Sequence, residues 1–290
     1  MSAYFSLAQT SSEFTATTQQ ELSDSLKTAF LAASWTLEFE DSTERELRSV
    51  ASDISTNRCR VRLIETGGNC LNLTLRTDDA TKVSQAHFLL PGRKFKTFIN
   101  PYQFFILAPN QFIPRTFIAG GALHIPPHHQ GIIANALWMQ GNGSSDTDVS
   151  DDRCSFRELL SVNSGGQSWQ CVNHVLHTAQ AWSGASQRLI CQTGATGTGV
   201  FSGGLNASGY TWADGTPFKS AAQIEWAPAS GDPHKTYGFI WDALTITADD
   251  LNSDTLHPFD GKYWWNITLS RSIPNWENLV FPGSLLVLHP

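Results

Sequence analysis

The segment from Phe98 to Phe112, FINPYQFFILAPNQF, contains four phenylalanines, a tyrosine, two isoleucines and a leucine, and it has no charged residue. Asn100 and Pro101 interrupt it, because proline restricts the residue before it and cannot donate to a strand ladder. After this break the stretch 103–108 is apolar without alternation, which is typical of a strand covered on both faces. A fold that contains this strand therefore needs protein on both sides of it.

The segment 18–33 predicts an amphipathic helix that could supply one of these covers. Thr18 and Glu21 have the spacing of a capping box, which satisfies free N–H groups at a helix start. The apolar residues that follow recur at helical spacing and form one stripe: Leu22, Leu26, Ala29, Phe30 and Ala33. We expect Leu26 and Phe30 to pack on the strand that carries Phe104 to Leu107.

A hairpin is predicted next, from CRVRLIET and CLNLTLRT. In both segments apolar residues alternate with polar ones, and the connection TGGN is rich in turn-forming residues. The chain has five cysteines and no CxxC motif, which favours free buried thiols over a zinc site or a disulfide framework. A bridge between Cys59 and Cys70 across this hairpin remains an open alternative.

The predicted fold class is α+β. We expect an N-terminal helix packed on a small mixed or antiparallel sheet over residues 1–140, followed by a mainly β domain over 154–290. Residues 141–153 separate them, because this stretch is rich in Asp, Ser and Gly and is typical of a linker.

The sequence offers little chemistry. The net charge is -7 and no block of Lys and Arg occurs, which argues against a nucleic-acid partner, and no apolar run is long enough to span a membrane. No nucleophile, phosphate-binding or dinucleotide motif is present. We therefore predict no catalytic residue, no cofactor and no metal. The alternatives weighed and not preferred are a metal at His124, His128 and His129, a nucleophile pair of Cys171 with His174 or His177, and a carboxylate pair of Asp242 and Glu225.

The order of several segments resembles that of virion proteins of tailed bacteriophages, often tail-associated. The segments that carry this resemblance are LAASWTLEFE, FINPYQFFILAPN, RTFIAGGALHIP and the later series FIWDALTIT, FDGKYWWNITLS and PGSLLVLHP. The resemblance implies a structural subunit at a tail, connector or baseplate, made in the bacterial cytoplasm and located in the virion. Its partners would be other virion proteins and copies of itself, with a host surface glycan left open.

Assembly requires surfaces that a neighbouring subunit covers. Charged residues form only 16% of the chain, against about a quarter in a typical soluble domain. Large apolar patches on such a surface mark interfaces, and the interface candidates are Phe104, Phe105, Leu285, Leu286, Val287 and Leu288. The alternative function is a carbohydrate-binding or carbohydrate-cleaving protein with exposed indoles. The positions of five tryptophans distinguish the two functions: Trp212, Trp226, Trp241, Trp264 and Trp265.

Overall fold

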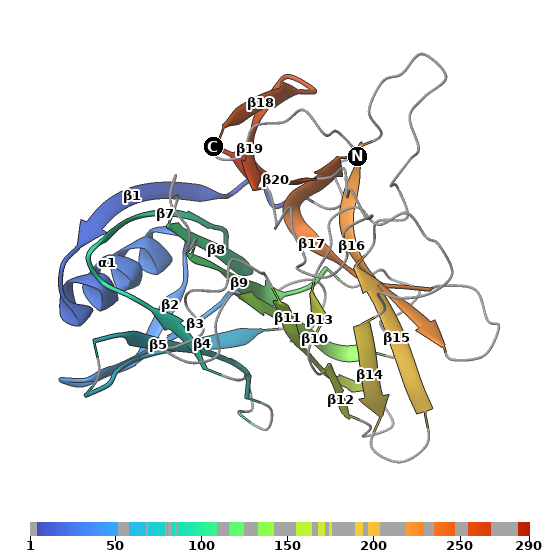
Figure 1. Cartoon of the computed structure of the whole chain (residues 1–290), viewed down its shortest axis with the longest axis horizontal. Helices are drawn as coiled ribbons and strands as arrows, with labels where there is room; N and C mark the ends of the chain where they lie inside the picture. The colour runs from blue at the N-terminus through green and yellow to red at the C-terminus, as the bar shows by residue number, and fades with distance from the viewer. Residues whose placement is uncertain are drawn as a thin grey trace, which may run out of the picture.

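The computed structural model describes residues 5–51, 58–67, 69–78, 80, 83–84, 86–108, 116–124, 133–141, 155–163, 168–171, 174–175, 189–193, 197–203, 219–228, 235–246, 255–267 and 284–290. Within these residues the chain is mostly β, and α1 is the one helix (Figure 1). Every strand pairing recorded in them is antiparallel, as expected where consecutive strands form hairpins.

The elements follow one another along the chain with the helix near the start. Their bounds are β1 (Thr10–Ala16), α1 (Gln19–Ala32), β2 (Thr36–Glu40), β3 (Glu44–Arg48), β4 (Cys59–Glu65), β5 (Leu71–Thr77), β6 (His87–Leu89), β7 (Arg93–Ile99), β8 (Gln103–Ala108), β9 (Thr116–Ala122), β10 (Ile133–Gly141), β11 (Ser155–Asn163), β12 (Ser168–Cys171), β13 (His174–Val175), β14 (Leu189–Thr193), β15 (Gly197–Gly203), β16 (Lys219–Pro228), β17 (Lys235–Ile246), β18 (Leu256–Phe259), β19 (Lys262–Ile267) and β20 (Ser284–His289).

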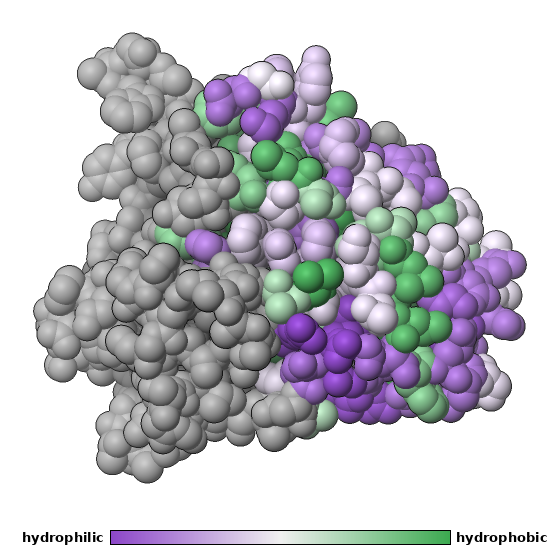
Figure 2. Space-filling view, turned by 180° about the vertical axis from the view of Figure 1, so that it is seen from behind, coloured by the Kyte–Doolittle hydropathy of each residue, from purple (hydrophilic) through white to green (hydrophobic). Residues whose placement is uncertain are grey.

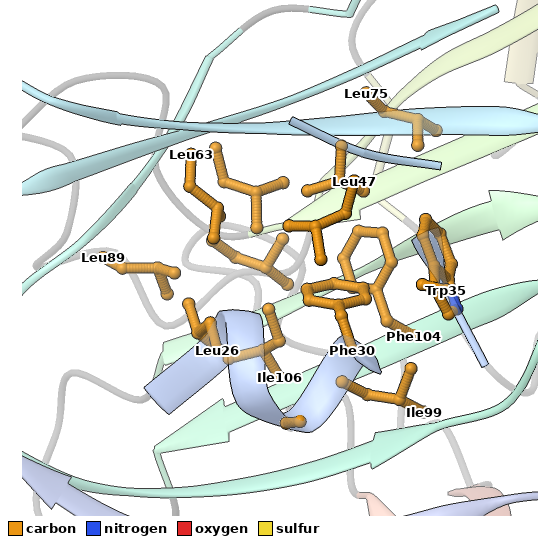
Figure 3. Packing of buried hydrophobic residues seen from close by; sticks show 14 of the residues in the cluster. Leu26, Phe30, Trp35, Leu47, Leu63, Leu75, Leu89, Ile99, Phe104 and Ile106 are labelled. Atoms are coloured by element: carbon orange, nitrogen blue, oxygen red, sulfur yellow. The ribbon is translucent and has the colours of Figure 1, made fainter. Parts of the chain in front are cut away.

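A long sheet has the strand order β1-β7-β8-β9-β10-β11-β12-β14-β15-β16-β17-β20-β19-β18, with β13 paired to β11. A second sheet has the order β2-β3-β4-β5-β6. Figure 1 shows α1 between this five-stranded sheet and the β1–β7 end of the long sheet. One hydrophobic cluster joins all three layers, since it contains Leu26 of α1, Leu63 of β4 and Phe104 of β8 (Figure 3).

The helix forms as the sequence predicts. Thr18 is its N-cap and accepts a hydrogen bond on Oγ1 from the Glu21 backbone N–H at 3.1 Å, while the Glu21 carboxylate accepts from Thr17 N at 2.7 Å. The predicted stripe is buried, and Phe30 packs edge-on against Trp35 and Phe104, with ring centroids 4.8 and 5.4 Å away. The predicted contact of Phe30 with the β8 strand is therefore confirmed, and Leu26 belongs to the same hydrophobic cluster.

The predicted hairpin is β4–β5, in which Val61 lies opposite Leu75 and Leu63 opposite Leu73, all four buried. Cys59 and Cys70 are both buried and free. They sit at opposite ends of the hairpin, since Cys59 pairs with Thr77 while Cys70 directly precedes β5, so the open disulfide alternative does not occur. Burial raises the pKa of the Cys59 thiol to about 12.

The opening apolar segment forms the antiparallel pair β7–β8, with its turn at the predicted Asn100 break. The Asn100 side chain fixes this turn, because its Oδ1 accepts from the N–H groups of Tyr102 and Gln103, each at 2.9 Å. Every residue of β8 is buried. Phe104 meets the helix, and Phe105 faces the other way, with its ring centroid 5.9 Å from that of Trp138. Trp138 belongs to β10, two strands along the same sheet, and lies beside Phe105 on this face. The cover of the face comes from the C-terminal strands of the same chain, since Phe98, which pairs with Phe105, has its ring centroid 6.0 Å from that of Trp265.

The predicted linker, 141–153, lies outside the described residues except for Gly141, which ends β10. The strands that flank it, β10 and β11, pair with each other in antiparallel register. The long sheet therefore continues from one side of the linker to the other.

Candidate functional site

Five of the six predicted interface residues are buried inside the single chain. Phe104 and Phe105 have no exposed surface, and Leu286 and Val287 have none either. Leu288 is also buried, and the side chain of Leu285 lies outside the described residues. A side chain without exposed surface has nothing to offer a partner, so the apolar run of β20 is explained by its place between β17 and β19. The sequence showed correctly that these residues need cover, and the chain itself provides it.

The tryptophans of the C-terminal half differ in how far they are buried. Trp241 and Trp264 are buried, whereas Trp265 is half-buried. Trp264 packs edge-on against Phe5 with ring centroids 5.5 Å apart, and its Nε1 donates to the Phe259 carbonyl. The side chains of Trp212 and Trp226 lie outside the described residues. Those tryptophans of this half whose side chains are described therefore form no row of exposed indoles.

Asp242 is the most chemically unusual carboxylate among the described residues. It is fully buried and has a positive φ of 50°, which is uncommon outside glycine. Burial raises the pKa of its carboxyl, while the hydrogen bonds that Ser6, Leu7 and Asn100 donate act in the opposite direction. These donors occupy both of its oxygens.

This carboxylate belongs to a seam that ties the N-terminal segment to the C-terminal strands. Gln9 Nε2 donates to the Leu288 carbonyl, and the amide of Gln103 both donates to the Trp241 carbonyl and accepts from the Trp241 N–H. Each of these hydrogen bonds joins segments more than a hundred residues apart. We interpret Asp242 as part of this structural seam. Glu225, the other carboxylate of the pair that was weighed and not preferred, has a side chain outside the described residues.

The histidines weighed as metal ligands and the cysteine–histidine pair lie only partly within the described residues. His124 pairs with Phe239 through two backbone hydrogen bonds of 2.9 Å, and His128 and His129 lie outside the described residues. Among the residues that the structure describes, no group of three His, Cys, Asp or Glu side chains is placed to hold a metal. Cys171 and His174 lie on the two short strands β12 and β13, and His177 lies outside the described residues.

One exposed apolar surface lies on the hairpin β18–β19. Leu256 pairs with Trp265, Pro258 with Tyr263, and Tyr263 with His289, so these side chains lie on one side of the sheet. Tyr263 is 60% exposed and Leu256 47% exposed. We call this surface, formed by Leu256, Pro258, Tyr263, Trp265 and His289, the hairpin face. Figure 1 shows the strands that carry it, β18 and β19, next to the C-terminus.

The Trp265 ring of the hairpin face is in contact with the charged group of Lys96. Lys96 Nζ lies 4.0 Å from the centroid of the Trp265 ring and donates to Glu13 at 2.8 Å. Hydrogen bonds from Lys94 and Lys96 lower the pKa of Glu13 to about 2. Lys96 thus covers one face of the Trp265 ring, whereas the neighbouring Tyr263 remains exposed.

Sequence reasoning did not single out the hairpin face, although a signal for it was present. Asp260 and Gly261 stand between two apolar segments, and Asp-Gly favours two-residue hairpin turns that need positive φ at both positions. The structure has φ values of 52° and 69° at these residues. The alternation of Tyr263 and Trp265 with the buried Trp264 then separates an outer face from an inner one.

No protein-family model matches the chain, and no curated protein matches its sequence significantly. Among the described residues, no helix has the length and apolar character needed to cross a membrane.

Proposed function

We propose that the chain is a structural subunit of a bacteriophage or phage-like particle, associated with its tail, connector or baseplate. It acts without catalysis, through contacts with other virion proteins and with copies of itself around a symmetry axis. The order of its segments and its low charged fraction support this proposal. The observation that carries it in the structure is the hairpin face.

The hairpin face has the character of a protein interface. Aromatic residues are enriched in such interfaces, and charged residues are depleted at their centres. Tyr263 and Leu256 are exposed at the last strand pair of the long sheet. Pro258 lies in the edge strand β18 and has no N–H to donate, which disfavours addition of another strand there. A partner would therefore contact the side chains of this face and leave the strand edge unpaired.

The test is sedimentation velocity of the purified chain over a concentration series. We expect the wild-type chain to associate and the double variant Leu256→Ser, Tyr263→Ser to sediment as a monomer. Leu31→Ser is the matched control, since Leu31 is 42% exposed on α1 and lies outside the hairpin face. Equal association of the wild type and the double variant would remove the hairpin face from the interface.

The finer organisation is also proposed: an α+β domain over residues 1–140 and a β-rich domain over 154–290. The two hydrophobic clusters support this division. One draws only on residues up to Leu137, and the other combines Leu244, Trp264, Leu286 and Leu288, with Phe5 packed against it. Limited proteolysis should cut first between 141 and 153; first cuts elsewhere would count against the division.

One observation favours the alternative of a carbohydrate-binding protein. Tyr263 and Trp265 present two aromatic side chains on one side of a sheet, and aromatic rings supply apolar faces that can stack on sugars. Binding of a glycan to a stable monomer, lost in Tyr263→Ala, would favour this function over assembly.

A further inference from the structure

Arginines that are scattered along the sequence meet on the outer face of the five-stranded sheet. Arg48, Arg60 and Arg76 lie directly opposite one another on β3, β4 and β5. Arg58 and Arg62 precede and follow Arg60 by two residues, the period that keeps side chains on one face of a strand. We call these five residues the arginine face. Figure 2 shows hydrophilic side chains gathered low on the view, in the region of this sheet.

Within the described residues, carboxylates balance the charge of the arginine face only in part. Glu46 is nearly buried and is shared by three arginines: Arg60 at 2.9 Å, Arg62 at 3.9 Å and Arg76. Glu38 pairs with Arg48 at 3.0 Å, Glu44 with Arg62, and Asp78 with Arg60 at 3.1 Å. Among the residues that the structure describes, five guanidinium groups thus meet four carboxylates. Like charges directly opposite on neighbouring strands are unfavourable.

The arginine face also has more donors than acceptors. Each guanidinium carries five N–H groups and accepts none. The Nε–H groups of Arg58 and Arg76 are buried without a hydrogen-bond partner. On the same strand face as Arg76, Thr74 Oγ1 is buried and without a partner as well. Leaving such groups unsatisfied is costly, more so for a charged group.

We propose that the arginine face binds an oxyanion of the phosphate or sulfate type, with Arg58 and Arg76 as its main donors. Such a group carries several acceptor oxygens and matches the planar fork of arginine. A bound oxyanion would add negative charge and acceptor oxygens to a face where Glu46 alone is shared by three arginines. Small rotations of these surface guanidinium groups would bring their Nε–H groups to the ligand. This site is independent of the hairpin face and of the assembly proposal.

The overall charge of the chain limits the kind of ligand. The net charge is -7, so a long polyanion would be repelled outside this face. A single oxyanion group, free or carried on a sugar, requires only a local excess of guanidinium groups such as the one that the described part of this face has. We therefore expect a compact ligand group and no nucleic acid.

Thermal unfolding with increasing sodium phosphate, against sodium chloride at equal ionic strength, tests the proposal. A ligand of the folded state raises Tm in a saturable manner, and we expect a rise on the order of 2–4 °C at low millimolar phosphate. Phosphate also stabilises proteins by exclusion from their surface, an effect that does not saturate. The saturable part should disappear in Arg58→Ala and in Arg76→Lys.

Lys94→Ala is the control, since it removes an exposed cation that is bound to Glu13 and lies on β7 of the other sheet. It should keep the full phosphate response. Glucose 6-phosphate, compared with glucose, shows whether a carried phosphate group binds as well as the free ion. The absence of a saturable response, or a response unchanged in both arginine variants, would overturn the proposal.

Discussion

Phe30 connects the three layers of the N-terminal half, and its truncation tests that packing directly. Its side chain has no exposed surface, and its ring contacts Trp35 and Phe104 edge-on. Figure 3 shows it between the helix and the leucines of the five-stranded sheet. Phe30→Ala removes a ring that these neighbours enclose on several sides and leaves a cavity, because the surrounding strands can close only in part.

The expected loss in unfolding free energy is about 3–5 kcal/mol, as for other buried aromatic truncations. Two edge-on aromatic pairs place the expected value in the upper part of that range, since each contributes roughly 0.5–1.5 kcal/mol beyond the area it buries. For a chain of this size the loss corresponds to a fall in Tm of roughly 6–20 °C. It is a large fraction of the 5–15 kcal/mol that is typical of folded proteins.

Urea unfolding followed by tryptophan fluorescence measures this loss, with Leu31→Ala as the matched control. Leu31 is the next residue of the helix and is 42% exposed, so its truncation should change the unfolding free energy by only about 0.5 kcal/mol. If Phe30→Ala cost no more than Leu31→Ala, the helix would not be docked as described.

Three further predictions follow from buried contacts. Because burial raises the folded-state pKa of Asp242, the wild type should lose stability relative to Asp242→Asn as the pH rises above about 4, the ordinary pKa range of a carboxyl. Unfolding curves of both proteins between pH 4 and 8 measure this loss. A difference in unfolding free energy that does not change with pH would contradict the prediction. Gly121→Ala places a Cβ 2.5 Å from the Gln103 backbone at a φ of 144° and should cost at least about 2 kcal/mol in urea unfolding, whereas Gly67→Ala, with no atom within 4 Å, should not. Deleting 285–290 removes β20 from between its neighbours and should make the chain insoluble on expression; a soluble, folded product would show that this strand is dispensable.

Local patterns predicted the local structure well. The stripe from Leu22 to Ala33, the capping residue Thr18 and the Asn100 break each depend on residues a few positions apart, and each corresponds to an observed element. Propensity, capping and turn chemistry act over such distances, so one sequence is sufficient to identify them.

The sequence could not show what covers an apolar strand. It marked Phe105 as needing protein on a second side, and that side proved to be closed within the same chain, with Trp265 against Phe98, the cross-strand neighbour of Phe105. The seam at Asp242 depends on Ser6 and Asn100, which are distant in sequence. The arginine face was equally hidden, because its members alternate with apolar residues and become neighbours only through strand pairing. Such contacts depend on topology, which composition and spacing do not specify.

The mass of the purified full-length chain, measured by multi-angle light scattering up to high concentration, tests the proposed role as an assembly subunit most directly. We expect a species whose mass is a whole multiple of 31.9 kDa, and a multiple of one in the Leu256→Ser, Tyr263→Ser variant. A wild-type chain that remains at 31.9 kDa at every concentration and binds no virion protein would contradict it.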